Sequence, residues 1–482
     1  MTSVTAQNDS TALDRETMIV ASVVLLGAIM SILDTTVINV AIDRLAIDFH
    51  ASLTTIQWVV TGYTLALAAV IPLSGWAADR FGTKRIYIGS LALFMLGSGL
   101  CAVAWDAGSL IAFRVLQGLG GGMIMPVVMT ILTRKAGPER MGRVMGLLGV
   151  PMLAAPILGP ILGGWLVDDV SWRWIFLINI PIGIAAIALA QIVLECDEPQ
   201  PGHRLDWLGM ALLSPGLALL IFGLAESNGA GFAATESWLP IVAGAALVAG
   251  FLRHGWDAAE PLIDVRTFIQ TRAGAAAGTL LMFAIAFFGS LLLIPLYYQA
   301  VRGASALEAG LLMAPQGLGA MITMPIAGKL TDRHGPERWP AYGIPLLLVG
   351  LAPFAFVGAH TSYVLLCGSS FVLGLGMGLA MMPTMTAAMQ AVPRAAIART
   401  STAMNILRQS GASIGTAILS VLLASAISDK HAKGGEALAE AFAQTFVWGL
   451  ALLTLALIPA LAMAMGRSRW HAPTRDASAT AN

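Results

Sequence analysis

Charged residues are scarce in this sequence. Lys, Arg, Asp and Glu together make up 11% of the 482 residues, whereas hydrophobic residues make up 57%. Soluble globular proteins carry about 25% charged residues. A water-soluble fold could not cover so much apolar surface, so we predict a polytopic membrane protein. The formal net charge is zero, which argues against a nucleic-acid partner.

Cysteines and catalytic motifs are also few. Cys101, Cys196 and Cys367 are the three cysteines, and their wide separation indicates neither a disulfide framework nor a metal site. The sequence contains no phosphate-binding Gly-x4-Gly-Lys-Ser/Thr loop, no His-Glu-x2-His and no nucleophile elbow. We therefore expect a protein that is not an enzyme, has no cofactor, and draws its energy from an ion gradient rather than from ATP.

Long apolar segments, by contrast, fill most of the chain. A membrane-spanning helix needs roughly 20 mostly apolar residues. Lipid offers no partners to an open backbone, so the predicted fold is all helical. We predict fourteen spans, of which the eighth is short: 18–41, 57–77, 86–104, 109–132, 142–167, 174–194, 206–225, 238–252, 273–298, 307–330, 340–358, 363–389, 401–427 and 442–465.

Lys and Arg concentrate on one side of this predicted membrane protein. If the N-terminus is cytoplasmic, the inner segments hold twenty of them and the outer segments five, while Arg114 and Arg408 fall inside spans. Cytoplasmic loops of membrane proteins carry an excess of these residues. We therefore predict a multi-pass protein of the cell (inner) membrane with both termini in the cytoplasm.

One charged motif occurs twice, each time at the end of an apolar span. Its pattern is Gly-x3-Asp-Arg-x-Gly-x2-Arg, and the second copy lies 253 residues after the first. Internal repeats of this kind are typical of secondary transporters. The copies pair Gly75, Asp79, Arg80, Gly82 and Arg85 with Gly328, Asp332, Arg333, Gly335 and Arg338.

Further matches extend the duplication to two halves of six spans each. At an offset of 256 residues, the glycines of 118–122 match those of 374–378, and Arg143 matches Arg399. Spans seven and eight have no counterpart. The predicted organisation is a cytoplasmic tail, an N-terminal half, two inserted helices with linkers, a C-terminal half and a second cytoplasmic tail: 1–17, 18–194, 195–272, 273–465 and 466–482.

Four motifs in order resemble those of a known family. They lie at Leu33–Ala41, Gly75–Arg85, Leu110–Gly120 and Ala155–Gly164, and the segment Ser171–Pro181 is similar to the start of the family's sixth helix. Over nearly the whole chain, the sequence resembles the major facilitator superfamily, specifically its fourteen-helix drug:proton antiporters. One departure is Asp43, which stands where the first motif usually has proline.

Two charges within the predicted spans are candidates for proton coupling. Charged groups inside a bilayer cost around 3 kcal/mol each on insertion scales, so they are functional candidates. By helix rise, Asp34 lies roughly 10 Å and Arg114 roughly 8 Å below the outer boundary. We predict that Asp34 is the protonatable carboxylate and that Arg114 tunes it; the alternative is a static ion pair that sets helix packing. The resemblance implies coupling roles for both.

The repeated motif is predicted to form a gate on the cytoplasmic side. We expect Asp79 to contact the start of span thirteen near Arg399, and Asp332 to contact the start of span five near Arg143. A carboxylate near a helix N-terminus and an arginine is favourable. The alternative is that these charges only fix topology and turn geometry, and we favour that alternative for Asp332 but not for Asp79.

Other residues are weaker candidates. Span five is predicted to be a bent interface helix, and the resemblance implies an antiporter role for Pro156, Gly159, Pro160, Gly163 and Gly164. Arg408 could bind an anionic group, but we favour a side chain that reaches back to the cytoplasmic surface. A methionine stripe on span twelve is expected to be core packing. Candidate substrate-pocket residues are Tyr63, Gln117, Phe287, Gln316 and Asn405.

The function that these patterns favour is proton-coupled export of lipophilic or amphiphilic compounds by alternating access. Deep carboxylates are absent from spans 9–14, which favours neutral or weakly cationic substrates, or lipids. Two alternatives stay open on the same fold, namely export of an endogenous lipid or metabolite, and uptake by symport. We expect small lipophilic substrates, protons and the lipid bilayer as partners, and a protein that acts as a monomer.

Overall fold

The computed structural model describes residues 14–137, 140, 142–144, 158–159, 162–196, 204–258, 260–270, 272–393, 396–429 and 435–465. Within these ranges every regular element is helical. Three short helical turns, η1 (Ile38–Ala41), η3 (Leu166–Val170) and η4 (Ala352–Phe356), accompany the α-helices. The helices are α1 (Arg15–Val37), α2 (Ile42–Asp48), α3 (Leu53–Phe81), α4 (Thr83–Ala102), α5 (Ala107–Ala136), α7 (Trp174–Leu177), α8 (Asn179–Val193), α9 (Trp207–Ala230), α10 (Thr235–Asp257), α11 (Val265–Gln270), α12 (Arg272–Ala300), α13 (Ala306–His334), α14 (Trp339–Leu351), α15 (Tyr363–Gln390), α16 (Ile397–Asp429) and α17 (Gly435–Met465).

The described residues contain 13 helical segments long and apolar enough to cross a membrane. They match thirteen of the fourteen predicted spans, and the remaining one, 142–167, lies largely outside the described residues. The eighth span was predicted to be short, but α10 has 23 residues. The helix extends beyond the apolar residues into a polar last turn. There Arg253 Nη1 lies 3.4 Å from Asp257 Oδ2, four residues later, and such a pair favours the helix.

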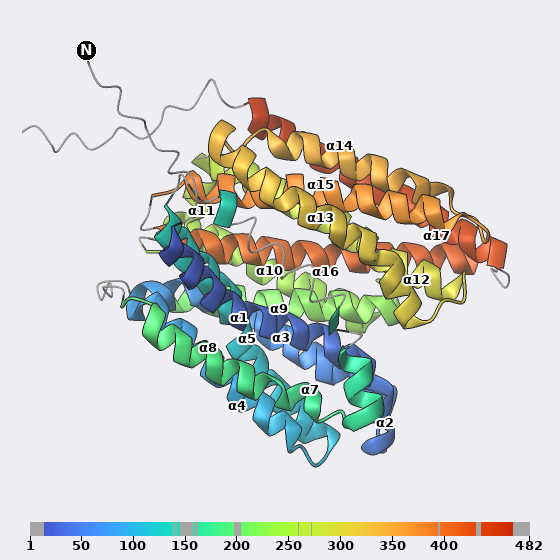
Figure 1. The fold of residues 1–482 in the computed structure, drawn as a ribbon, viewed down its shortest axis with the longest axis horizontal. Helices are drawn as coiled ribbons and strands as arrows, with labels where there is room; N and C mark the ends of the chain where they lie inside the picture. The colour runs from blue at the N-terminus through green and yellow to red at the C-terminus, as the bar shows by residue number, and fades with distance from the viewer. Residues whose placement is uncertain are drawn as a thin grey trace, which may run out of the picture.

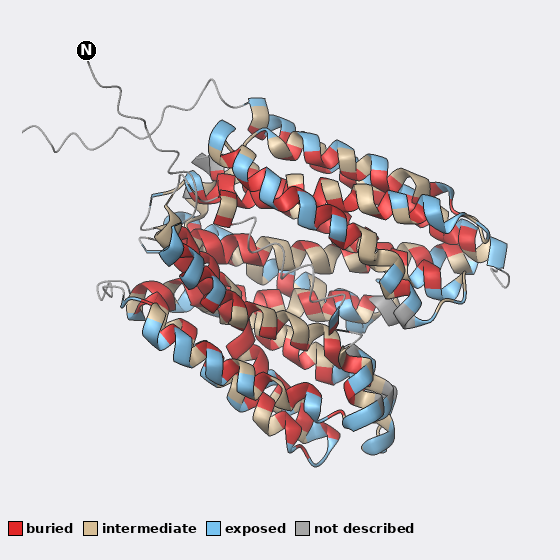
Figure 2. Cartoon of the chain, viewed as in Figure 1, coloured by how far each residue is buried: buried red, intermediate tan, exposed pale blue. Residues whose placement is uncertain are grey.

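The outer faces of the helices are strongly apolar. Figure 2 shows buried residues between the helices and exposed residues on the faces that point away from the bundle. Many exposed side chains are large and hydrophobic, such as Ile192 at 82% and Val364 at 83% exposure. A water-soluble protein rarely exposes so much contiguous apolar surface. The helices therefore present a lipid-facing perimeter, and the chain is a multi-pass membrane protein.

The bundle consists of two halves with a helical insertion between them. Helices α1, α3, α4, α5 and α8 form one half and α12 to α17 form the other, with α9 and α10 between them in Figure 1. Helix α9 packs against both α3 and α16, so it contacts both halves at once. Leu213 and Leu217 of α9 share one hydrophobic cluster with Ile71 of α3 and Ile406 of α16.

The two copies of the repeated motif have the same backbone geometry. α3 ends at Gly82 with φ 88°, and α13 ends at Gly335 with φ 82°. Each glycine N–H donates to a carbonyl in the last helical turn, Ala78 at 3.0 Å and Thr331 at 2.9 Å. Residues with a Cβ rarely adopt positive φ, so glycine is needed at both positions. The motif therefore stops each helix with the same turn.

Glycine contacts repeat between the halves as well. A Cβ on Gly118 of α5 would lie 2.5 Å from the Tyr63 carbonyl oxygen of α3, and a Cβ on Gly374 of α15 would lie 1.9 Å from the Gln316 carbonyl oxygen of α13. Tyr63 and Gln316 are 253 residues apart, which is the spacing of the charged motif. Small residues allow membrane helices to approach this closely. The duplication therefore preserves the helix contacts themselves.

We predict that Gly374→Ala destabilises the protein. The added methyl group would overlap the α13 backbone, and overpacking of this kind costs about 1–3 kcal/mol. The measurement is the thermal unfolding midpoint of the purified protein, which should fall by several degrees. Gly368→Ala on the same helix is the matched control, because a Cβ there meets no atom within 4 Å. An equal midpoint for both variants would refute this view of the α13–α15 contact.

Candidate functional site

The N-terminal half contains a buried ion pair. Arg114 Nη1 of α5 lies 2.6 Å from Asp34 Oδ2 of α1, and both side chains are fully buried. The second carboxylate oxygen accepts hydrogen bonds from Gln117 Nε2 at 2.8 Å and from Asn179 Nδ2 at 3.1 Å. Asp34 and Arg114, which were predicted to lie at the same depth, are therefore in direct contact. Charge and hydrogen-bonding capacity of the carboxylate are both satisfied inside the bundle.

The arginine is held by further contacts. Its Nε donates to the Val59 carbonyl oxygen at 3.2 Å, and Nη1 also donates to Gln117 Oε1 at 2.7 Å. The Tyr63 ring lies under the guanidinium, with 4.1 Å between Arg114 Cζ and the ring centroid. Arg114 therefore contacts α1, α3 and its own helix. Removing one partner from a buried ion pair costs about 3–5 kcal/mol, because the other charge is left uncompensated.

Asn179 is a member of this network that sequence reasoning missed. Its amide nitrogen also donates to Ser98 Oγ of α4 at 3.0 Å, and that hydroxyl donates to the Phe176 carbonyl oxygen at 2.9 Å. The signal was available, because Asn179 is a polar residue in an otherwise apolar stretch of the sixth span. Such a residue in a membrane helix usually hydrogen-bonds a neighbouring helix. Asn179 thus ties α8 to the carboxylate.

A central cavity of about 370 Å³ lies between the two halves. Residues of α1, α3 and α5 form one side, and residues of α12, α13, α15 and α16 form the other. The first side carries hydroxyl groups, whereas the second is rich in methionine. Its walls are Ser31, Ile32, Thr35, Thr36, Tyr63, Thr64, Leu67, Ile71, Gly121, Gly122, Met125, Pro126, Phe288, Met324, Met377, Met381, Met382, Asn405, Arg408 and Gln409.

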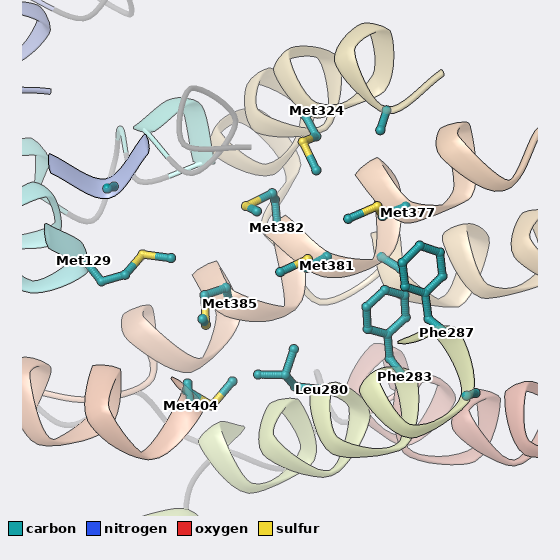
Figure 3. Packing of buried hydrophobic residues seen from close by; sticks show 14 of the residues in the cluster. Met129, Leu280, Phe283, Phe287, Met324, Met377, Met381, Met382, Met385 and Met404 are labelled. Carbon is teal, nitrogen blue, oxygen red and sulfur yellow. The ribbon is translucent and has the colours of Figure 1, made fainter. Parts of the chain in front are cut away.

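Methionines contribute much of the apolar wall. Figure 3 shows Met324 of α13 near Met377, Met381 and Met382 of α15, all on facing helix surfaces. All four are buried and line the cavity. The methionine stripe of span twelve consists of Met377, Met381, Met385 and Met389. Its members Met377 and Met381 therefore line the cavity as well as packing in the core. Unbranched methionine side chains adapt to ligands of different shape.

Tyr63 connects the ion pair to the cavity. It lines the cavity while its ring packs on Arg114. Its hydroxyl is 3.5 Å from Ser31 Oγ, which lines the same wall. Asp34 and Arg114 themselves are not among the lining residues. The Tyr63 ring therefore contacts both the Arg114 guanidinium and the cavity.

The predicted pocket residues divide into three groups. Tyr63 and Asn405 line the central cavity. Phe287 and Gln316 do not; they line a separate void of about 10 Å³, room for about one water molecule. Gln117 does not line the central cavity either, and its side chain bonds Asp34 and Arg114. Helix rotation decides these outcomes, and a single sequence specifies it only weakly.

The side chain of Arg408 lies in the central cavity rather than at the cytoplasmic surface. A side chain that reaches the cytoplasmic surface was expected, but Arg408 lines the central cavity. Eleven residues separate it from Ile397, the start of α16, which is about 17 Å by helix rise. An extended arginine side chain is too short to cover that distance. Asp43, the other residue of open role, lies in α2, and its side chain is outside the described part of the structure.

The first copy of the repeated motif reaches across to the other half. Asp79 Oδ1 accepts a hydrogen bond from Arg134 Nη2 of α5 at 2.8 Å. Its Oδ2 lies 3.8 Å from Arg399 Nε, near the start of α16. The predicted contact between Asp79 and the start of span thirteen is therefore present.

The second copy makes the reciprocal contact. Asp332 Oδ1 accepts a hydrogen bond from the Gly142 backbone N–H at 2.8 Å, and Oδ2 lies 3.4 Å from Arg143 Nε. We had favoured a purely topological role for this carboxylate, so the contact corrects that preference. The two aspartates bind opposite halves at the same end of the bundle. We name these two sets of contacts the crossed latch.

The crossed latch is reinforced by close backbone approach. A Cβ on Gly75 would lie 2.8 Å from Thr402 Oγ1, and a Cβ on Gly328 would lie 2.5 Å from the Gly142 carbonyl oxygen. The Ser74 and Thr402 hydroxyls are 3.0 Å apart. The motif glycines therefore let α3 and α13 touch the opposite half.

Four other motif residues make no ion pair within the described part of the chain, namely Arg80, Arg85, Arg333 and Arg338.

Span five is described only in part. Gly159 and Gly163 pack on α1, where an added Cβ would lie 2.1 Å from Thr36 Oγ1 and 3.0 Å from the Val37 carbonyl oxygen. A Cβ on Gly164 would meet nothing within 4 Å. Pro156 and Pro160 lie outside the described residues. The glycines thus support close helix packing beside the helix that carries Asp34.

A duplicated helical bundle with a central cavity, a buried ion pair and a latch between its halves defines a secondary membrane transporter. The chain belongs to the Major Facilitator Superfamily, whose sequence model matches residues 24–416. Its membership is consistent with the motifs of both halves and with the helical architecture.

Two sequence relatives illustrate this membership. The Multidrug resistance protein B homolog of Mycobacterium tuberculosis is 48% identical over 408 residues, which cover 84% of this chain and 75% of the relative. The Multidrug export protein EmrB of Haemophilus influenzae is 31% identical over 409 residues, covering 82% and 78%.

Two solved structures share the fold. The human organic anion transporter MFSD10 aligns with a TM-score of 0.65 at 14% identity, over 92% of this chain and 100% of that one. The proton:xylose symporter XylE aligns with a TM-score of 0.60 at 14% identity, over 91% and 95%. At this identity the comparison concerns the fold alone.

The crossed latch generates a prediction about conformation. Asp79→Asn removes the negative charge that faces Arg134 and Arg399, so the latched end should open more often. We expect a cysteine placed at Thr402, which is 1% exposed, to react several-fold faster with a polar maleimide in this variant. The measurement is the labelling rate in nanodiscs, in a background without the native cysteines.

The control for this experiment is Arg338→Gln, a charge change within the same motif at an exposed residue without an ion pair. Its labelling rate should match that of the parent protein. If Asp79→Asn labels no faster than this control, the latch does not hold the halves together.

Proposed function

We propose that this protein exports lipophilic or amphiphilic molecules from the cytoplasm in exchange for protons. One observation carries the proposal: Tyr63 packs on Arg114 of the buried Asp34–Arg114 pair and also lines the central cavity. A change in the charge of Asp34 therefore alters the wall that a substrate touches. The names of the relatives, which include multidrug resistance and multidrug export proteins, support the direction of transport and the breadth of substrates.

The proton step uses the carboxylate and its donors. In one access state Asp34 is ionised and accepts bonds from Arg114, Gln117 and Asn179. When the carboxylate takes up a proton from the outside, Arg114 loses its counter-charge and keeps its own proton. The guanidinium must then find other acceptors, and the adjoining Tyr63 ring must shift with it. Proton uptake thereby drives substrate release, and proton loss to the cytoplasm resets the site.

The gating step uses the crossed latch. With the termini in the cytoplasm, as the distribution of Lys and Arg favours, the latch lies at the cytoplasmic end. Its closed form then corresponds to a cavity that communicates with the outside. Separation of Asp79 and Asp332 from the opposite halves would open the cytoplasmic end. The inner membrane supplies the proton gradient, and a monomer contains both halves of the mechanism.

Two other functions fit the same fold. An exporter of an endogenous lipid or metabolite would use the same steps with a narrower substrate range. An uptake symporter would reverse the direction of substrate movement. Transport in proteoliposomes separates the three, because an imposed pH gradient would expel dyes, expel only a lipid or metabolite, or accumulate the substrate.

The test of the coupling assignment is Asp34→Asn. We expect pH-gradient-driven transport in proteoliposomes to fall to the level of empty vesicles, because the amide cannot carry the proton. Substrate binding at equilibrium should weaken as well, because the neutral amide resembles the protonated carboxylate that drives substrate release. Asp257→Asn is the matched control, with a carboxylate that is 63% exposed. Full coupled transport by folded Asp34→Asn protein would contradict the assignment.

A further inference from the structure

The central cavity contains a charge that the proton step does not use. Arg408 lines it, whereas Asp34 and Arg114 do not. No carboxylate of the described residues pairs with Arg408, and no acidic side chain is among the lining residues. Arginine stays protonated in proteins, so this wall is permanently positive. A positive charge deep in a membrane protein without a counter-ion is costly, and it marks a place where an anion would be favoured.

The surroundings of Arg408 suit the head group of an amphiphile. Gln409 lines the same cavity and offers an amide donor beside the guanidinium. The Thr35 and Thr64 hydroxyls of the other wall donate to the Ile32 and Val60 carbonyl oxygens, at 2.6 Å and 2.9 Å, so their hydrogens are used within their own helices. Arginine binds carboxylates, phosphates and sulfonates through parallel hydrogen bonds. Arg408 and Gln409 are thus the donors that the cavity offers to an anionic group.

The rest of the cavity suits an apolar body. Met324, Met377, Met381 and Met382 lie near one another and line the cavity, as does Phe288. The volume of about 370 Å³ lies within the range of sites that bind drug-sized molecules. The methionine side of the cavity therefore sets few limits on the shape of a bound molecule. The Arg408 side favours a molecule that carries a negative charge.

From this juxtaposition we propose that the transported molecules are anionic amphiphiles, with the acidic head group bound by Arg408 and the apolar body against the methionines. The inference rests on the proposed export function and narrows its substrate class. It replaces the sequence-based expectation of neutral or weakly cationic compounds, which depended only on the lack of carboxylates in spans 9–14. Arg408 is then the residue that selects charge.

The experiment compares two fluorescent probes that differ by one acidic group, anilinonaphthalene sulfonate and phenylnaphthylamine. Binding is measured at equilibrium, without a pH gradient, to protein in phosphatidylcholine nanodiscs, with empty nanodiscs subtracted. Arg408→Gln should weaken sulfonate binding about tenfold or more, the loss expected for one charged hydrogen-bonded pair. It should change binding of the neutral probe by less than about twofold, and Arg408→Lys should retain most of the sulfonate affinity.

Arg253→Gln is the matched control, because it removes the same charge from a side chain that is 79% exposed and outside the cavity. It should change neither affinity. The proposal is overturned if Arg408→Gln weakens both probes equally, or weakens neither.

A second measurement avoids the variants altogether. Dodecanoate and dodecyl phosphate should displace the sulfonate from the unaltered protein, and dodecyltrimethylammonium should not. The stronger of the two acidic competitors identifies a carboxylate or a phosphate as the preferred head group. Displacement by the cation as effectively as by the acids would overturn the proposal.

Transport of the same probes separates this inference from the function it rests on. Selective sulfonate binding without efflux of either probe under a pH gradient would count against the exporter and leave the anion site standing. Efflux of both probes without charge selectivity in binding would support the exporter and overturn the anion site.

Discussion

The absence of water from the membrane interior is the constraint on which this structure depends. Backbone polar groups there must find partners within the protein, and buried charges are costly unless the protein or a bound molecule pairs with them. Asp34 meets this requirement with donors from two helices, Arg114 and Gln117 of α5 and Asn179 of α8. A small change in this arrangement leaves a group unsatisfied, so under the proposed mechanism proton gain or loss at Asp34 would shift the helices that hold it. The high cost of an unpaired charge in lipid would let a single carboxylate control the conformation.

The two halves share their packing but not their chemistry. Glycine contacts repeat faithfully, as the pairs Gly118–Tyr63 and Gly374–Gln316 demonstrate. The charged pair does not repeat, because the position 256 residues after Arg114 is Ser370. The N-terminal half thus holds the buried ion pair, and the C-terminal half supplies the methionine wall and Arg408. The duplicated halves therefore share a helical frame but differ in the polar groups that they carry.

Features that depend on local hydropathy or on a repeated motif could be predicted from the sequence, whereas features that depend on helix rotation could not. Thirteen of the fourteen predicted spans match helices of the described residues, because apolar length is a local property. The contact of Asp79 with Arg399 was anticipated because the motif and the arginines both recur in the two halves, whereas its contact with Arg134 was not. Asn179, Gln117 and Arg408 were missed or misassigned, since their roles depend on which way each helix face turns. Rotation about a helix axis is set by packing against neighbours, which hydropathy does not record. The partners of a side chain on other helices therefore could not be predicted, even for Asp34 and Arg114, whose depth in the membrane was predicted.

The inserted helix α9 has one more consequence, for how molecules dissolved in the bilayer reach the protein. Because α9 packs on α3 and α16 together, it covers the seam where those two helices of opposite halves meet. In this conformation, a lipophilic molecule that diffuses in the surrounding leaflets meets α9 at that seam. Lateral access to the cavity would then need another part of the perimeter, away from α9.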